Sequence, residues 1–361
     1  MADIVKNLIE LYGSPGGSAG RGGSLRLRRF EDVSGLCAAE FSDHDSFFVT
    51  FREGMLFIFK PYVPHVVPET GTAFVDSYFY AYRELYDAKR RLLEDLKAVY
   101  PEAETCRRGY KGLLLSLGFG RLLHSTLVWI KPFGTFFCVE IIDTSPSAYS
   151  PAREGTPAGP DGEPPEDPAC RTCGKCSAAC PSGALTASGF DRSRCLRQRQ
   201  FDSAEPGDPS EKEMGNRLLG CNECQLSCPR NAGIPGKIKR PGNDYYALFD
   251  LDVLAENCCR PGFKKSIYAE ILGYNYAKPL KVLARTLSAM LNDDPRKHLG
   301  TVKKLTCLEN NYAEPLLKRY IELCEAPEKE NAAPCCEDAA CCEDAACCED
   351  ADCSENARGG A

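Results

Sequence analysis

The sequence predicts an α+β protein with three folded parts, and three observations lead to this prediction. Residues 1–145 mix strand patterns with helix patterns. Eight cysteines are concentrated between Cys170 and Cys228. Residues 240–325 show an almost continuous helical pattern. A chain of 361 residues has room for two or three such domains.

The N-terminal part, residues 1–145, is expected to be an α/β or α+β domain. An amphipathic helix is predicted at residues 78–99, where apolar residues recur at helical spacing and opposite charges stand four residues apart. A short buried helix that runs into a glycine turn is expected at residues 112–120. Alternating, aromatic-rich segments predict strands at residues 46–61, 126–130 and 135–142.

The eight cysteines follow a proline-rich linker at residues 146–168 and define the second part, residues 169–235. The first four have the spacing C-x2-C-x2-C-x3-C-P, in which the fourth cysteine of a two-cluster ferredoxin ligates the other cluster. This rule assigns one [4Fe–4S] cluster to Cys170, Cys173, Cys176 and Cys228. It assigns a second [4Fe–4S] cluster to Cys180, Cys195, Cys221 and Cys224.

Zinc and disulfides are the alternative explanations for so many cysteines. Zinc sites pair C-x-x-C knuckles across a longer loop and do not need a tight triplet of cysteines. Disulfides need an oxidising compartment. We expect no signal peptide, no twin-arginine signal at Arg28 and Arg29, and no membrane span, because no apolar run is long enough. The sequence therefore predicts two iron–sulfur clusters in a cytoplasmic protein without a membrane partner.

The third part, residues 240–325, is expected to be all-helical, with a helical-repeat pair as one arrangement. The segment LKVLARTLSAML is amphipathic, and the run from Asn292 to Pro295 predicts the end of its helix. Outside the eight, the cysteines of the folded parts are expected to be buried apolar residues. They are Cys37, Cys106, Cys138, Cys258, Cys259, Cys307 and Cys324.

The acidic tail, residues 326–361, repeats CCEDAA with almost no apolar bulk, which predicts disorder. Its thiol pairs either bind soft metal ions or have no dedicated role. The tail holds 10 acidic and 2 basic side chains, and it accounts for the formal net charge of −7. Residues 230–304, in contrast, hold 14 basic and 7 acidic side chains. That excess is the footprint of a polyanionic partner or a solvated helical face, and charge alone favours the solvated face.

Segments around the cysteines resemble the epoxyqueuosine reductase family, which consists of iron–sulfur and cobalamin enzymes related to reductive dehalogenases that act on tRNA. The resemblance is strong in MGNRLLGCNECQLSCPRN, residues 214–231. It is weaker in LGFGRLLHSTLVWIKPFGTFFCVEIIDTSP, residues 117–146, and in ALFDLDVLAENCCRPGFKKS, residues 247–266. It covers roughly residues 45–325.

The resemblance implies a function for each part. Residues 1–145 would form a substrate and corrinoid-type domain, and a cobalamin reduced through the two clusters would remove the epoxide oxygen of epoxyqueuosine in tRNA. An external donor such as flavodoxin or ferredoxin would supply the electrons. The basic region 230–304 would become a tRNA surface with interleaved aromatic residues, namely Tyr245, Tyr246, Tyr274 and Tyr276. The resemblance does not indicate an oligomeric state.

The chain departs from the family at the position of the proposed proton donor, an aspartate. Counting back from Gly118 places Glu104 there, so Glu104 is the predicted catalytic residue. The alternative is a solvated glutamate near the end of a helix. The segment after Cys195 also differs from the family. Two other functions stay open: a related double-cluster reductase with another substrate, and an electron-transfer protein without a substrate of its own.

Overall fold

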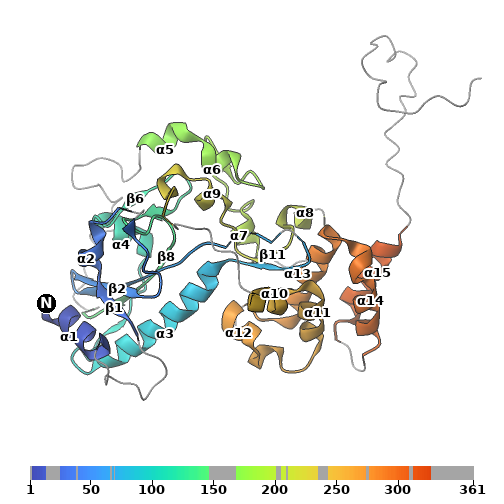
Figure 1. Ribbon diagram of the computed structural model, residues 1–361, viewed down its shortest axis with the longest axis horizontal. Coiled ribbons are helices and arrows are strands. Elements are labelled where there is room, and N and C mark those ends of the chain that lie inside the picture. Colours follow the sequence, from blue (N-terminus) through green and yellow to red (C-terminus); the bar gives the residue numbers. More distant parts are fainter. Residues whose placement is uncertain are drawn as a thin grey trace, which may run out of the picture. The chain divides into compact units, whose positions relative to one another are not determined.

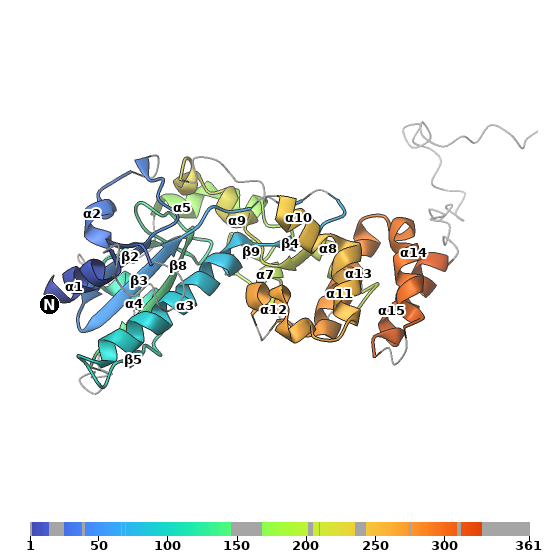
Figure 2. The same cartoon turned by 60° about the horizontal axis from the view of Figure 1, so that its bottom comes forward.

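The structure is a computed structural model, in which Met1–Cys324 form one compact unit. The elements can be followed by colour along the chain in Figures 1 and 2. The predicted linker, apart from Pro168, and the predicted tail, apart from Ala326, lie outside the described residues. The structure describes residues 2–13, 25–37, 40–65, 67–68, 70–145, 168–200, 205–208, 210–234, 243–273, 276–308 and 312–326.

A five-stranded sheet with the order β1-β2-β3-β8-β5 forms the centre of the N-terminal part. β1 pairs parallel to β2, and the other pairs are antiparallel. The turn between β2 and β3 consists of Glu53 and Gly54, which both have positive φ, as a two-residue hairpin turn requires. The strands are β1 (Leu27–Arg29), β2 (Phe47–Arg52), β3 (Met55–Pro61), β5 (Glu104–Thr105) and β8 (Phe137–Asp143).

The two faces of the sheet are covered differently. On one face, α1 (Ala2–Gly13) and α3 (Ser77–Lys97) bury aliphatic side chains such as Leu85 and Leu92 (Figure 2). On the other face, Phe48, Phe57 and Phe59 pack with further aromatic side chains. That face is covered by α2 (Phe30–Ser34), α4 (Tyr110–Ser116) and the small hairpin of β6 (Arg121–Leu122) and β7 (Val128–Trp129).

The predicted helices and strands of this part are confirmed. The strands expected at 126–130 and 135–142 enter different sheets, because β7 pairs with β6 and β8 joins the main sheet. A bridge between Ile130 and Gly134 closes the turn between them. The helix expected at 112–120 is α4, followed by Gly118 with a φ of 71°.

The cysteine-rich part consists of short elements held against the N-terminal part. β11 pairs parallel with β4 (Phe74–Val75) of the N-terminal part. Gly220, directly after β11, has a φ of 94° and faces Asp76 at the start of α3. The elements are α5 (Pro168–Cys173), α6 (Lys175–Ala178), β9 (Leu185–Thr186), β10 (Gly189–Phe190), α7 (Leu196–Arg199), α8 (Ser210–Met214), β11 (Arg217–Leu219), α9 (Glu223–Leu226) and the 3-10 helix η4 (Pro229–Asn231).

The C-terminal part is helical, as predicted. The helix end expected at Asn292–Pro295 is confirmed, because Asp294 caps the next helix and Pro295 is its first residue. Phe79 of α3 and Leu218 of β11 contribute to the same hydrophobic core. The elements are α10 (Asn243–Phe249), α11 (Leu251–Cys259), η5 (Phe263–Lys265), α12 (Ile267–Leu272), α13 (Pro279–Asn292), α14 (Pro295–Thr306) and α15 (Glu314–Glu325).

The expected burial of the other cysteines is correct for some of them and wrong for two. Cys138, Cys258 and Cys259 are buried, while Cys106 and Cys324 are half-buried. Cys37 and Cys307 are exposed. Both follow the end of a helix, α2 and α14 respectively, where the chain lies at the surface and a small side chain needs no apolar partner.

Candidate functional site

The first predicted set of cysteines surrounds a cavity of about 290 Å³. The lining includes Cys170, Cys173, Cys176 and Cys228. Gly174 adopts the left-handed conformation between α5 and α6, so the chain reverses and brings the close-spaced cysteines to one place. The distant Cys228 comes from the N-cap of η4. The cavity walls also include His124, whose Nε2 lies 2.9 Å from the carbonyl oxygen of Thr186.

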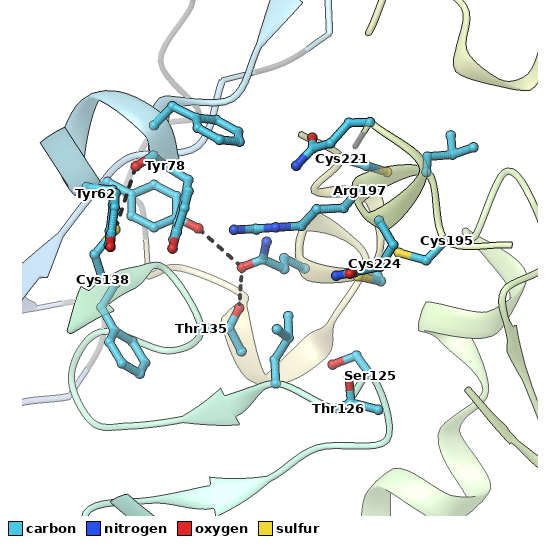
Figure 3. Close-up of a pocket in the computed structure, with 18 of the residues that line it drawn as sticks. Tyr62, Tyr78, Ser125, Thr126, Thr135, Cys138, Cys195, Arg197, Cys221 and Cys224 are labelled. Atoms are coloured by element: carbon cyan, nitrogen blue, oxygen red, sulfur yellow. Dashed lines mark hydrogen bonds between the residues drawn. The ribbon is translucent and has the colours of Figure 1, made fainter. Parts of the chain in front are cut away.

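The second predicted set lines a different and much larger cavity, of about 1330 Å³. Its cysteines are Cys180, Cys195, Cys221 and Cys224. Figure 3 shows three of them on one wall of this cavity, opposite residues of the N-terminal part. The structure thus brings each predicted set together around its own cavity, with Cys180 and Cys228 exchanged between the two halves of the cysteine run.

Burial raises the pKa of thiols in both sets, namely Cys176, Cys221, Cys224 and Cys228. Burial, together with the charges of Cys170 and Cys173, raises the pKa of Cys176. Burial likewise raises the pKa of Cys221 to about 11. Binding to iron requires thiolates, so cluster assembly in these buried positions releases protons and depends on pH.

Cys180 differs from the other cluster cysteines in its surroundings. Burial would raise its pKa, but hydrogen bonds from the Leu185 and Ala184 amides and from Ser182 outweigh burial and lower it. The Ala184 amide donates to Cys180 Sγ at 3.2 Å. Such N–H···S bonds stabilise the thiolate, and in iron–sulfur proteins they help to set the reduction potential of the cluster.

The large cavity is bounded opposite the cysteines by tyrosines of α3. Tyr78, Tyr82 and Tyr86 are four residues apart, so they lie on one face of the helix and all line the cavity. The rings of Tyr78 and Tyr82 are stacked, with centroids 5.7 Å apart. Thr135, two residues before β8, donates to Gln225 Oε1 at 3.0 Å and thereby joins the N-terminal part to the cysteine-rich part (Figure 3).

Sequence reasoning did not identify these tyrosines or Arg197, another residue of the cavity. The period of four in Tyr78, Tyr82 and Tyr86 was a visible signal within the predicted helix. Arg197 carried no comparable signal, because its position depends on the docking of α7 against α3. Its guanidinium lies 4.1 Å from the ring centroid of Tyr78.

Glu104, the predicted catalytic residue, is placed elsewhere. It lies in β5, opposite Asp143 of β8, and its side chain is 43% exposed. Its Oε2 lies 3.5 Å from Arg107 Nη2. Among the described residues, Glu104 is not part of the lining of either cysteine cavity. Its catalytic role stays a prediction that this position does not support.

The basic region 230–304 divides into buried and exposed residues. Arg285 is 5% exposed and pairs with Glu211 at 2.7 Å, and Tyr245 is buried, with a hydroxyl that donates to Ala73. These two residues stabilise the fold and do not face solvent. Lys237, Lys239, Arg240 and Tyr274 lie outside the described residues. Among the described residues, the exposed cations are Arg230, Arg260, Lys264, Lys265, Lys278, Arg296, Lys297, Lys303 and Lys304.

The comparisons with known proteins agree with this site. A family model described as a 4Fe-4S double cluster binding domain matches residues 169–231. An uncharacterized protein of Geobacillus stearothermophilus is 38% identical over 74 residues, which are 19% of this chain and 34% of that protein. Epoxyqueuosine reductase of Xanthomonas campestris pv. campestris is 39% identical over 87 residues, which are 23% of each chain. The matched part of the chain thus spans about a quarter to a third of these relatives.

A solved structure extends the similarity beyond the cysteines. Epoxyqueuosine reductase from Streptococcus thermophilus matches with a TM-score of 0.51 and 19% identity, over 74% of this chain and 71% of that chain. None of the helices in the described residues is long and apolar enough to cross a membrane. Residues 169–231 are therefore a 4Fe–4S double cluster binding domain, and the chain around them has the mixed helix-and-sheet fold of epoxyqueuosine reductase.

Proposed function

We propose that this protein is an oxidoreductase of the epoxyqueuosine reductase type, which passes electrons through two [4Fe–4S] clusters into the large cavity. The observation that carries the proposal is that four cysteines of the double cluster domain form a wall of that cavity. A cluster held there would lie beside whatever the cavity binds, and electrons would not have to cross a further protein layer. The first cluster would be held by Cys170, Cys173, Cys176 and Cys228, and the second by Cys180, Cys195, Cys221 and Cys224.

The cavity fits a corrinoid by its size and by its position beside the second set of cysteines. With a volume of about 1330 Å³, it has room for a large cofactor and for part of a substrate. Cobalamin would supply a strongly nucleophilic reduced cobalt for epoxide removal. Residues of α3, of α7 and of the segment before β8 would surround it, among them Tyr78, Arg197 and Thr135.

The chain's own residues would bind and orient the substrate in this cavity. Tyr82 and Tyr86 are 38% and 40% exposed, and Tyr110 is 44% exposed, so aromatic rings remain accessible at the cavity. Arg83 and Arg90 line the same side. Aromatic rings interleaved with cations suit an unstacked nucleotide from a single-stranded RNA loop. We therefore include epoxyqueuosine in tRNA as the substrate, with a flavodoxin or ferredoxin as the electron donor.

Anaerobic reconstitution followed by a cobalamin titration tests the proposal. We expect about eight iron atoms per chain, as two [4Fe–4S] clusters require, saturable binding of one cobalamin, and reduction of epoxyqueuosine in an anticodon stem-loop RNA. Protein that holds both clusters but no cobalamin would instead support an electron-transfer protein without a substrate.

A second candidate is a double-cluster reductase with a different substrate. The position of Glu104 favours it, because this carboxylate lies in β5 and pairs with Arg107 instead of reaching the cavity. Cobalamin binding without turnover of epoxyqueuosine RNA would select this second function over the first.

A further inference from the structure

Arg197 is a cation inside the large cavity that the two clusters do not require. It lies on α7, two residues after Cys195, in the segment that departs from the family pattern. Figure 3 shows its side chain extending from the cysteine wall toward Tyr62 and Tyr78. The guanidinium carbon lies 4.1 Å from the Tyr78 ring centroid, which places the guanidinium over the face of the ring.

The carboxylates that line the cavity either form ion pairs with other cations or are exposed to solvent. Three of the lining carboxylates have a cation partner, and the fourth, Glu270, is exposed. The pairs are Asp87 with Arg83 at 3.4 Å, Glu140 with Lys89 at 3.3 Å, and Glu223 with Arg217 at 2.6 Å. Within the described part of the chain, Arg197 therefore has an aromatic neighbour and no ion-pair partner.

Asp76 is the other acidic group near Arg197, and its role is structural. Its Oδ1 accepts a hydrogen bond from the Tyr78 amide at 3.0 Å and caps α3. The residue is fully buried against Gly220. Asp76 and Arg197 attract each other electrostatically, but among the described contacts no ion pair or hydrogen bond joins them, and Arg197 lines the cavity.

Arg197 is half-buried, and a partly buried cation without an ion pair costs folding free energy, which a bound anion would offset. A guanidinium offers a planar fork of donors that matches the two oxygens of a phosphate or carboxylate. We propose that Arg197, held by Tyr78, forms an oxyanion subsite that binds a phosphate or carboxylate group of the molecule in the cavity. This subsite deepens the proposed function and rests on it only for the identity of that molecule.

Inorganic phosphate is the first probe, titrated calorimetrically into cluster-loaded protein in a chloride buffer. Arg197→Met keeps a long, unbranched side chain and removes the charge, and we expect it to weaken phosphate binding at least about tenfold, since charged hydrogen bonds are worth this much. Arg197→Lys keeps the charge but lacks the planar fork of donors. Its phosphate affinity should lie between those of the wild type and Arg197→Met. Arg194→Met is the matched control, because Arg194 is exposed and is not part of the cavity lining. It should change phosphate affinity less than about twofold.

Equal phosphate affinity in Arg197→Met and Arg194→Met overturns the subsite, as does a wild-type protein that binds no phosphate. If Arg197→Met does not hold its iron, Arg197→Gln replaces it under the same criteria. The electron paramagnetic resonance spectrum of the reduced clusters gives a second measurement. Phosphate should shift the spectrum of the wild type, and it should leave the spectrum of the neutral variant unchanged.

Two further titrations identify the source of the oxyanion. Cobinamide lacks the phosphate of cobalamin, so a loss of cobalamin affinity without a loss of cobinamide affinity in Arg197→Met assigns the oxyanion to the cofactor. Weaker binding of an anticodon stem-loop RNA, with both corrinoids unaffected, assigns it to the RNA. Phosphate binding that depends on Arg197 in a protein inactive on epoxyqueuosine RNA keeps the subsite and contradicts the proposed function.

Discussion

At the scale of single residues, the exchange of Cys180 and Cys228 between the two cysteine sets is the most informative feature. Cys228 lies 52 positions after Cys176 in the sequence, yet both line the smaller cavity. Cys180 stands four positions after Cys176 and lines the larger cavity instead. Cysteines that are close in the sequence thus line different cavities, and cysteines far apart in the sequence line the same one.

Pairs of alanine variants test this exchange. Cys228→Ala should lower the iron content from about eight to about four atoms per chain, because one cluster loses a ligand. Adding Cys170→Ala should cause no further loss, since both residues line the smaller cavity and are proposed to hold the same cluster. Adding Cys180→Ala should remove nearly all iron. Cys307→Ala is the control, because Cys307 is exposed and lies outside the double cluster domain. A linear assignment predicts instead that both double variants lose nearly all iron, because Cys170 and Cys180 would then hold the same cluster and Cys228 the other.

A second prediction concerns the buried pair of Arg285 and Glu211, with side chains 4% and 7% exposed. Arg285→Met should lower the free energy of unfolding by about 3 kcal/mol, because it leaves a buried carboxylate without its cation. Urea unfolding of the wild type and the variant measures this loss. Replacing both residues, as Arg285→Met with Glu211→Leu, should restore most of the stability.

The pH dependence of this variant follows from Glu211. Burial raises its pKa even with Arg285 present, and removal of the cation raises it further. A carboxyl group with a raised folded pKa destabilises the protein at pH values above that pKa and ceases to do so when it is protonated. The defect of Arg285→Met should therefore shrink as the pH falls from 8 toward 5. A defect that is constant over this range would contradict the assignment.

At the scale of elements, capping side chains fix where helices of the C-terminal part begin. Asp250 caps α11, and its Oδ1 accepts hydrogen bonds from the Asp252 and Val253 amides, both at 3.0 Å. α11 contributes Leu251, Leu254 and Cys258 to the hydrophobic core. The cap thus fixes the start of a helix whose buried residues all belong to the hydrophobic core.

Asp250→Ala should destabilise the protein by about 1 kcal/mol, the usual contribution of such a cap. Thermal unfolding followed by circular dichroism at equal iron content measures the change. Asp250→Asn is the matched control, because asparagine accepts the same hydrogen bonds and should retain most of the stability. Equal losses in the two variants would show that the charge, and not the cap, matters.

At the scale of the whole molecule, the parallel pairing of β4 with β11 joins the cysteine-rich part to the N-terminal part. Gly220 lies at this junction, next to Cys221. A Cβ atom there would lie 2.5 Å from Cβ of Asp76, and the φ of 94° is unfavourable for other residues. The close approach of the two backbones therefore requires glycine.

Gly220→Ala should destabilise the molecule by more than about 2 kcal/mol, from backbone strain and the contact with Asp76. It should also accelerate iron loss, since Cys221 follows directly. Gly233→Ala is the control for strain alone, because Gly233 has a φ of 82° and no atom within 4 Å of its Cβ position. Iron release to a chelator and thermal unfolding measure both effects. Equal behaviour of the two variants would contradict a specific role of the junction.

The local features of this molecule follow from its sequence. The spacing of Cys170, Cys173, Cys176 and Cys180 indicates a double cluster domain, and the apolar period of residues 78–99 predicts α3. Both patterns are short in sequence. Over such a distance, local backbone geometry determines which side chains are neighbours. Epoxyqueuosine reductase, the family suggested by the residues around Cys221, also has the observed fold.

Tertiary structure decided which charged residues reach the cavity. Glu104 pairs with Arg107 in β5, Arg285 is buried in an ion pair, and Arg197 enters the cavity. No local pattern distinguishes these charged residues from one another. Their positions depend on contacts between segments far apart in the chain, such as the β4–β11 pair, whose residues are more than 140 positions apart. The sequence by itself therefore determined the double cluster domain and most helices, and long-range packing determined the large cavity lined by Cys180, Cys195, Cys221 and Cys224.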